Sequence, residues 1–303
     1  SVALESKDVN CAADQPLRMH LLRSATFVLD IGKERLLVDP MLCDVGQLKA
    51  MPGVSGLKIL GSDGRKNPLV LLPANSEQLL HGLTGVLITH IHPDHLDAVA
   101  KGWIKDRNLP VWASASDVDY LKGKGLDDRE IKDGSMGLRV ELIPCEHGRG
   151  VVGWLAGVVV GYFLSAPGQA SIYITGDTVI TPEVTDVLRR LAPDVVLAPA
   201  GAANFGLGSD LLFTVEEMRQ LCSMVQSKLV FYHLETLDHC PTTRVFLRAL
   251  VKEEGAEGKT LIPDDGETLE FAAPGVSNTE PSVVTRALSG GFQGMMMQLS
   301  VDL

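Results

Sequence analysis

Hydrophobic positions near the N-terminus fall into three short runs that polar or turn residues separate. They are Leu17 to Leu22, Thr26 to Ile31 and Arg35 to Val38, with the pair Gly32-Lys33 between the last two. Apolar or alternating runs joined by a short glycine turn are typical of antiparallel strands. We therefore expect the folded core to start with an antiparallel meander.

Strand patterns and helix patterns then alternate along the chain. Strands are predicted at Gly85 to Ile88, Val111 to Ser114, Leu138 to Pro144, Val158 to Leu164, Ser171 to Thr175, Asp194 to Pro199, Lys228 to Tyr232 and within Thr260 to Phe271. Helices are predicted at Leu96 to Asp106, Ala115 to Gly123, Pro182 to Leu191, Thr214 to Val225 and Thr242 to Glu254, with Thr181 and the Thr214/Glu217 pair as N-terminal caps. This alternation fits either an αββα sandwich or a doubly wound sheet.

Three segments lack clear periodicity. Residues 1–16 are polar, and residues 272–303 turn to Pro, Gly, Ser and Met. Residues 41–77 are punctuated by glycine and proline, and a loop of this length is usually a lid, a binding loop or an insert. We expect one domain over residues 1–303, with its core at about 17–271 and the 41–77 loop able to cover a site.

Composition and charge narrow the choice of partners. The chain has 303 residues, of which 45% are hydrophobic and 21% charged, an ordinary globular composition. Its net charge of −11 argues against a nucleic-acid or anionic-membrane surface, because both need a basic face. The longest apolar stretch, Val151 to Leu164, is too short to span a bilayer, and no signal-peptide pattern is present. We expect a small-molecule substrate, with neither nucleic acid nor membrane as partner.

Cysteine use indicates the compartment. The five cysteines are scattered and form no C-x-x-C pair, which argues against a disulfide framework and a thiolate zinc site; they are Cys11, Cys43, Cys145, Cys222 and Cys240. We therefore expect a reducing, cytoplasmic environment. The apolar segment Met295 to Met297 could pack on its own core or on a second copy, which leaves a homo-oligomer open.

The densest chemical signal is Thr89-His90-Ile91-His92-Pro93-Asp94-His95, directly after the strand pattern at Gly85 to Ile88. Imidazole nitrogens and carboxylate oxygens are common ligands of zinc and similar ions. His90 and His92 share one side of an extended segment, so both rings can aim at one ion. A turn at Pro93 would direct Asp94 and His95 toward a neighbouring ion. Four candidate ligands this close rarely serve core packing, so we predict a metal site.

Ligand-type side chains also follow four other predicted strands. They are Asp39, His147, Asp177 and His233, and strand ends are where α/β architectures place their sites. Asp39 precedes Pro40, which disfavours helical geometry before it. Taken on its own, Asp39 is better interpreted as a turn-capping residue than as part of a site.

These residues together resemble the metallo-β-lactamase superfamily, specifically its lactonase and phosphodiesterase-like branch of metal-dependent hydrolases. The resemblance covers about residues 17–250 and is carried by Val38-Asp39-Pro40, the motif at 89–95, His147-Gly148-Arg149, Tyr173-Ile174-Thr175-Gly176-Asp177-Thr178 and Tyr232-His233-Leu234-Glu235. It implies an αββα sandwich of two mixed sheets with a dinuclear site between them. By similarity, His90, His92 and His147 hold the first ion, Asp94, His95 and His233 hold the second, and Asp177 bridges them. Asp39 would steady the cluster through hydrogen bonds.

The resemblance also implies a reaction. Two divalent ions, zinc first and manganese or iron(II) as alternatives, lower the pKa of a bridging water, and the resulting hydroxide attacks a small ester, lactone or phosphoester, including anionic ones. Asp94 is placed to orient the water or accept its proton. Arg149 could bind a carboxylate or phosphate in a bidentate fork, or be a structural arginine.

Two positions depart from the pattern, and two other functions stay open. Relatives often carry a histidine before the Ala25-Thr26 pair where this chain has Ser24, which removes a possible substrate contact. His239 is an extra candidate, either on the substrate side or as the final ligand, although His233 is preferred because it stands at a strand exit. The alternatives are a phosphodiesterase or nuclease of the same fold, and a non-catalytic metal-binding regulatory module.

Overall fold

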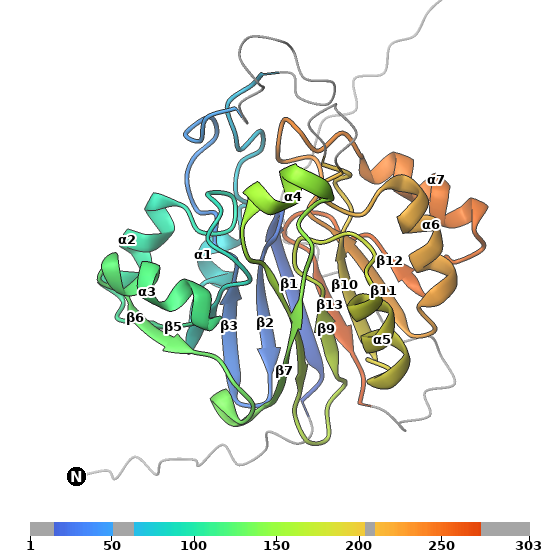
Figure 1. The fold of residues 1–303 in the computed structure, drawn as a ribbon. Helices are drawn as coiled ribbons and strands as arrows, with labels where there is room; N and C mark the ends of the chain where they lie inside the picture. The colour runs from blue at the N-terminus through green and yellow to red at the C-terminus, as the bar shows by residue number, and fades with distance from the viewer. Residues whose placement is uncertain (1–14, 51–63, 204–209, 274–303) are drawn as a thin grey trace, which may run out of the picture.

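The computed structural model describes residues 15–50, 64–203 and 210–273. Within these ranges, two mixed sheets pack face to face, and helices cover both outer faces (Figure 1). The αββα sandwich implied by the resemblance is therefore confirmed, and the doubly wound sheet is excluded. The segments 1–14, 51–63, 204–209 and 274–303 lie outside the described residues, and with them part of the expected 41–77 loop and most of the aperiodic segments at the two chain ends, including Met295 to Met297.

The first sheet has the strand order β13-β1-β2-β3-β4-β5-β6. Its strands are β1 (Leu17–Arg23), β2 (Thr26–Ile31), β3 (Glu34–Val38), β4 (Gly85–Leu87), β5 (Pro110–Ala113), β6 (Asp127–Glu130) and β13 (Thr268–Phe271). The predicted meander is confirmed, since β1, β2 and β3 pair antiparallel. Gly32 makes the β2–β3 turn with φ +61°, a conformation that glycine adopts without strain.

The second sheet has the order β12-β11-β10-β9-β8-β7. Its strands are β7 (Arg139–Pro144), β8 (Val160–Ser165), β9 (Ile172–Ile174), β10 (Val195–Pro199), β11 (Lys228–Tyr232) and β12 (Thr260–Leu261). The single strand expected within residues 260–271 is in fact two strands, one in each sheet. Pro263 cannot donate to a ladder, and Gly266 with φ +84° turns the chain from one sheet to the other.

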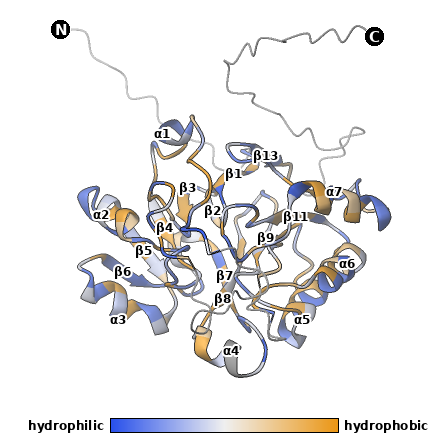
Figure 2. Ribbon diagram, turned by 90° about the horizontal axis from the view of Figure 1, so that it is seen from above, coloured by the Kyte–Doolittle hydropathy of each residue, from blue (hydrophilic) through white to orange (hydrophobic). Residues whose placement is uncertain are grey.

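Helices form the two outer layers (Figure 2). The first sheet is covered by α1 (Ser76–Leu79), α2 (Ala98–Asp106) and α3 (Ala115–Gly123), and the second by α5 (Pro182–Arg190), α6 (Val215–Met224) and α7 (Arg244–Glu253). The predicted caps are confirmed, because Thr181 Oγ1 accepts from the Val184 N–H and Thr214 forms a capping box with Glu217. None of the described helices combines the length and apolarity needed to cross a bilayer.

One further helix, α4 (Gly150–Ala156), stands at the rim above the strand ends (Figure 1). The sequence pattern did not separate it from the strand that follows, because both lie in one apolar stretch. Gly157, with φ +84°, ends the helix and starts the turn into β8.

The core between the sheets also fixes the base of the site. Phe27 of β2 and Tyr232 of β11 meet edge to face across the sheets, with ring centroids 5.8 Å apart, and both rings are buried. Tyr162 of β8 donates its hydroxyl hydrogen to the Ile88 carbonyl at 2.7 Å, immediately before the histidine motif. Full burial of such a side chain contributes roughly 1.5–3 kcal/mol, so these contacts hold the sheets in register beneath the motif.

Candidate metal centre

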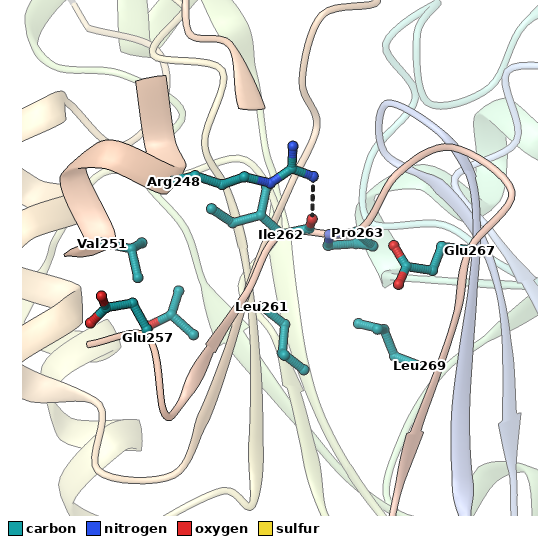
Figure 3. A pocket seen from close by; sticks show the side chains of 9 residues that line it. Arg248, Val251, Glu257, Leu261, Ile262, Pro263, Glu267 and Leu269 are labelled. Carbon is teal, nitrogen blue, oxygen red and sulfur yellow. Dashed lines mark hydrogen bonds between the residues drawn. The ribbon is translucent and has the colours of Figure 1, made fainter. Parts of the chain in front are cut away.

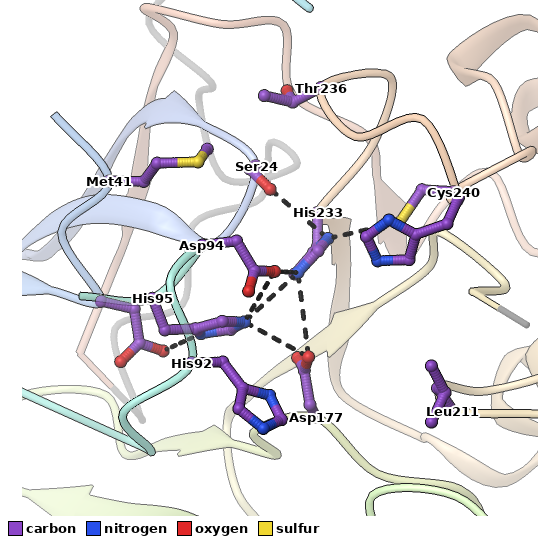
Figure 4. Close-up of polar contacts among 12 residues, drawn as sticks. Ser24, Met41, His92, Asp94, His95, Asp177, Leu211, His233, Thr236 and Cys240 are labelled. Atoms are coloured by element: carbon purple, nitrogen blue, oxygen red, sulfur yellow. Dashed lines mark hydrogen bonds and ion pairs between the residues drawn. The ribbon is translucent and has the colours of Figure 1, made fainter. Parts of the chain in front are cut away.

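Five strand ends from both sheets bring the predicted ligands together. Asp39 follows β3, the 90–95 motif follows β4, His147 follows β7, Asp177 follows β9 and His233 follows β11. Among the described residues, three groups of three side chains have their ligand atoms within 4.8 Å of one another. Two share no residue, namely His90, His92 and His147, and Asp94, His95 and His233; the third, His90, His95 and Asp177, links them. We call the two groups that share no residue the first trio and the second trio. Figure 4 shows members of the second trio converging with Asp177.

The spacing within the first trio suits a single ion. His92 Nδ1 lies 3.0 Å from His90 Nε2 and 3.2 Å from His147 Nε2. Two ligands at the usual zinc distance of roughly 2.0–2.1 Å, arranged as a tetrahedron, stand roughly 3.3 Å apart. A proton between imidazole nitrogens forms a hydrogen bond that joins only two of them. One metal ion could accept a lone pair from all three nitrogens.

The second trio has similar spacing. His95 Nε2 lies 3.4 Å from His233 Nε2 and 3.5 Å from Asp94 Oδ2, and the His233 Nε2 to Asp94 Oδ2 distance is 3.6 Å. Its donor set of two nitrogens and one oxygen also fits a divalent ion.

Asp177 lies between the two trios. Its Oδ2 is 3.2 Å from His95 Nε2 and 3.9 Å from His233 Nε2, and 3.7 Å from His147 Nε2 and 4.0 Å from His90 Nε2. Its Oδ1 is buried and accepts no hydrogen bond from any described residue. A buried carboxylate oxygen without a donor is unfavourable, so this orphaned atom fits a cation at the site.

The outer ring nitrogens have protein neighbours that set the ring orientations. His95 Nδ1 lies 3.0 Å from Asp39 Oδ2, His147 Nδ1 lies 2.9 Å from the Leu211 carbonyl oxygen, and His90 Nδ1 lies 3.0 Å from Thr89 Oγ1. These contacts leave Nε2 facing the site, the arrangement usual for metal-binding histidines. His92 is turned the other way and presents Nδ1.

Asp39 joins two strand ends rather than capping its own turn. It adopts φ +46°, on the left-handed side, instead of the extended geometry expected before Pro40. Its Oδ1 accepts from the Thr89 N–H at 2.8 Å, and its Oδ2 accepts from Thr89 Oγ1 at 2.7 Å. Strained backbone of this kind clusters at functional sites, and His233 shares it with φ +62°.

Burial and charge set the protonation of the cluster. Burial lowers the pKa of His90 and His147, and neighbouring rings lower it further. Burial alone would raise the pKa of Asp177, but the facing His95 and His233 hold it well below its usual range. Burial alone would lower the pKa of His95, but the carboxylates of Asp177, Asp94 and Asp39 raise it well above its usual value. A metal ion would take the place of that proton.

Two predicted catalytic residues lie outside both trios. Arg149 Nη2 donates to Glu217 Oε1 at 2.6 Å, so its charge already has a protein partner. His239 is buried with Nδ1 3.3 Å from Asp238 Oδ1, and it belongs to none of the ligand groups among the described residues. His233, by contrast, is in the second trio.

Ser24, where the resemblance leads us to expect a histidine, lies beside His233. Its carbonyl accepts from the His233 N–H at 3.1 Å, and its Oγ lies 3.4 Å from His233 Nδ1. Ser24 therefore lies behind a ligand-type ring, on the side away from the trio.

The described part of the 41–77 loop is tied to the segment after His233. Asn67 Nδ2 donates to Asp238 Oδ1 at 2.7 Å, and Asn67 Oδ1 accepts from the Asp238 N–H at 2.8 Å. The Leu69 N–H also donates to the Thr236 carbonyl. No local sequence pattern predicts this pairing, because the partners are 171 residues apart.

A separate cavity of about 270 Å³ lies where the edge strands β12 and β13 meet α7 (Figure 3). Its walls include Arg248, Leu261, Glu267 and Leu269. It shares no residue with the two trios.

Comparisons with known proteins identify the family of the chain. The model of the beta-lactamase superfamily domain matches residues 34–234. UPF0173 protein YddR of Bacillus subtilis is 28% identical over 257 residues, which cover 82% of this chain and 98% of that protein. An isothiocyanate hydrolase from Delia radicum gut bacteria superposes with a TM-score of 0.75 and 29% identity, over 84% of this chain and 100% of that one. A possible metal-dependent hydrolase from Veillonella parvula superposes with a TM-score of 0.76 and 27% identity, over 85% of this chain and 100% of that one.

Proposed function

Because the chain belongs to the beta-lactamase superfamily, we propose that it is a metal-dependent hydrolase with two divalent ions between its sheets. Several relatives are named metal-dependent hydrolases, which supports the reaction class. The position of Asp177 Oδ2, within 4.0 Å of a histidine nitrogen from each trio, carries the dinuclear part of the proposal. Since the ligands come from both sheets, we propose that residues 17–271 work as one domain.

The donor atoms favour particular ions. The first ion would have three nitrogens and one Asp177 oxygen, and the second two nitrogens and two oxygens. Zinc suits both sets, and manganese or iron(II) would suit the oxygen-richer second position. When bound, such ions lower the pKa of a coordinated water toward neutrality and polarise the electrophile.

The chain's own residues define the open side of the site. His92 and Asp94 keep partial exposure, whereas the other members of the trios and Asp177 are buried. We therefore propose that the substrate approaches from the side of His92 and Asp94. Burial would raise the pKa of Asp94, but His95 and His233 hold it well below its usual range, so an ionised carboxylate stands at the entrance. It can accept a hydrogen bond from the attacking water.

The substrate is proposed to be a small carbon electrophile, such as an ester or lactone. Isothiocyanates, which the relative at 29% identity is named for hydrolysing, are also attacked at carbon. A phosphodiester is the runner-up. The net charge of −11 counts against polynucleotides, and Arg149, two residues after His147, is already paired with Glu217.

The test combines metal analysis with a substrate panel. The full chain would be stripped, reloaded with zinc, manganese or iron(II), and assayed on aryl esters, lactones, isothiocyanates and bis(p-nitrophenyl) phosphate. We expect two ions per chain and chelator-sensitive hydrolysis of a carbon electrophile. His92→Ala should lose at least about 100-fold in turnover, while His81→Ala, an exposed histidine outside the trios, should not.

Other outcomes of the panel are equally informative. Turnover of the phosphodiester alone would favour the runner-up. Two bound ions without turnover of any compound would favour a non-catalytic metal-binding module, and full activity in His92→Ala would refute the site.

A further inference from the structure

The carboxylate of Glu217 makes more contacts than its capping role requires. Glu217 lies in the first turn of α6, and only 7% of its surface is exposed. Its Oε2 accepts from the Thr214 N–H at 2.9 Å, which completes the capping box. Its Oε1 accepts from Arg149 Nη2 at 2.6 Å and from the Ile180 N–H at 3.0 Å. A residue needed only to start a helix would use the first contact and not the other two.

The two extra donors belong to the segments that carry proposed ligands. Arg149 is two residues after His147, and Ile180 is three residues after Asp177. A single carboxylate oxygen therefore joins both ligand segments to the end of α6. The segment just before α6 also contacts His147 directly, because the Leu211 carbonyl oxygen lies 2.9 Å from His147 Nδ1.

The backbone next to His147 is bonded to the Asp177 segment, since the Glu146 carbonyl accepts from the Val179 N–H at 3.1 Å and the Glu146 N–H donates to Thr178 Oγ1 at 3.2 Å. Gly148 and Gly150 follow the histidine with φ of +102° and +64°, conformations that glycine adopts freely. His90 and His92, in contrast, follow a central strand that pairs on both sides. His147 is thus the member of the first trio whose position depends most on contacts from other segments.

We propose that Glu217 is a positioning residue that holds His147 and Asp177 in place for the first metal ion, an inference that rests on the proposed dinuclear site. Removal of Glu217 detaches both ligand segments, which are bonded to each other through Glu146, from the start of α6. The first position has two ligands on those segments and the second only Asp177, so zinc affinity falls mainly at the first position. Loss of a contact that orients a ligand typically lowers metal affinity roughly 10–100-fold.

The chain offers a matched control for the helix cap. Thr214 Oγ1 accepts from the Glu217 N–H at 3.1 Å, so Thr214→Ala damages the same capping box. It leaves the contacts of Glu217 Oε1 with Arg149 and Ile180 in place. Arg149→Met removes one of those two contacts without touching the cap.

The experiment measures zinc binding to the stripped full chain by chelator competition, together with the visible spectrum of the cobalt-loaded chain. We expect Glu217→Ala to weaken one of two zinc equivalents roughly 10–100-fold and to change the cobalt spectrum. Thr214→Ala should bind zinc within roughly 2-fold of wild type, although both variants lower the metal-free Tm. Glu217→Gln and Arg149→Met should fall between them, and they decide the matter if Glu217→Ala does not fold.

The inference is overturned if Glu217→Ala and Thr214→Ala lower zinc affinity equally. Equal losses would mean that the damaged helix cap, which both variants share, causes the effect. The inference is also overturned if Glu217→Gln and Arg149→Met both bind two zinc ions as tightly as wild type. A wild-type chain that binds only one zinc ion or none would refute the dinuclear proposal and, with it, this inference. Failure of the dinuclear proposal is therefore seen in the wild type, and failure of the Glu217 inference alone is seen only in the variants.

Discussion

The carboxylate of Asp39 faces the Nδ1 atom of His95 at 3.0 Å, and both side chains are buried. The two residues are 56 positions apart, at the ends of neighbouring strands. Because Nδ1 is engaged by the carboxylate, the ring turns Nε2 toward Asp177, 3.2 Å away. One supporting contact therefore sets the direction of a proposed ligand.

Asp39→Asn should weaken metal binding without removing any proposed ligand. The neutral amide cannot accept as strongly from His95 Nδ1–H, so we expect zinc affinity to fall roughly 10–100-fold. Competition with a chromogenic chelator measures the change. Asp44→Asn, an exposed carboxylate in the following loop, serves as control and should bind zinc as wild type does. Unchanged affinity in Asp39→Asn would contradict the supporting role.

Asp177→Asn should reduce the number of bound ions. The proposed sites share this carboxylate, and an amide lacks the charge needed between two cations. We expect at most one zinc ion per chain by elemental analysis and at least about a 100-fold loss of hydrolysis. Asp186→Asn, on the exposed face of α5, should retain two ions. Two tightly bound ions in Asp177→Asn would show that the carboxylate does not bridge.

Removal of metal should destabilise the fold. Without ions, the ligand atoms of the two trios and Asp177 crowd together inside the protein. A ligand that binds only the folded state stabilises it by about 2.7 kcal/mol at 100 times its Kd, so excess zinc should raise Tm by several degrees over the chelator-treated chain. Thermal unfolding followed by circular dichroism measures this shift. An equal Tm with chelator and with zinc would argue against a structural contribution from the ions.

Asp30, which lies outside the metal centre, should make the stability of the fold decrease at acid pH. Burial alone would raise its pKa, but His20 and Arg35 bring the pKa below its usual value. The stabilisation is thus complete above the unfolded pKa of about 3.9 and is lost as pH falls through the lower folded pKa. Asp30→Asn should lower Tm by about 2–4 °C at pH 6 and flatten the dependence below pH 4.

The measurement for Asp30 is the Tm difference from wild type, taken in chelator so that metal release does not contribute. Asp127→Asn is the control, because this exposed carboxylate pairs with an equally exposed Arg129. A Tm difference that grows as pH falls below 4 would reverse the sign of the argument.

Periodicity predicted most elements, and its failures have physical causes. α3 begins and ends where the pattern placed it, and β11 does too. β6 has no apolar pattern, because its residues, Asp127–Glu130, are all charged. It pairs with β5 at the sheet edge, where the Arg129 guanidinium lies 5.5 Å from the centroid of the Trp112 ring. α2 begins at Ala98 rather than Leu96, because the Asp97 side chain accepts from the Ala100 N–H and caps the helix there.

The ligand-type residues could be predicted because each follows a strand, and the parallel strand ends of both sheets meet at one edge of the sandwich. Their supporting contacts could not. Arg149 was linked to substrate because it neighbours His147 in sequence, yet its partner Glu217 lies 68 residues later. Which nitrogen His92 presents depends on the tertiary arrangement of His90 and His147, which no local pattern encodes.

The first sheet supplies His90 to His95 and the second supplies His147, Asp177 and His233. During synthesis the earlier half of the polypeptide leaves the ribosome before any ligand of the later half exists. If the ions bind as proposed, neither coordination shell can close until translation has passed residue 233. Tight retention of both ions would then distinguish a completed molecule from a truncated or half-assembled one.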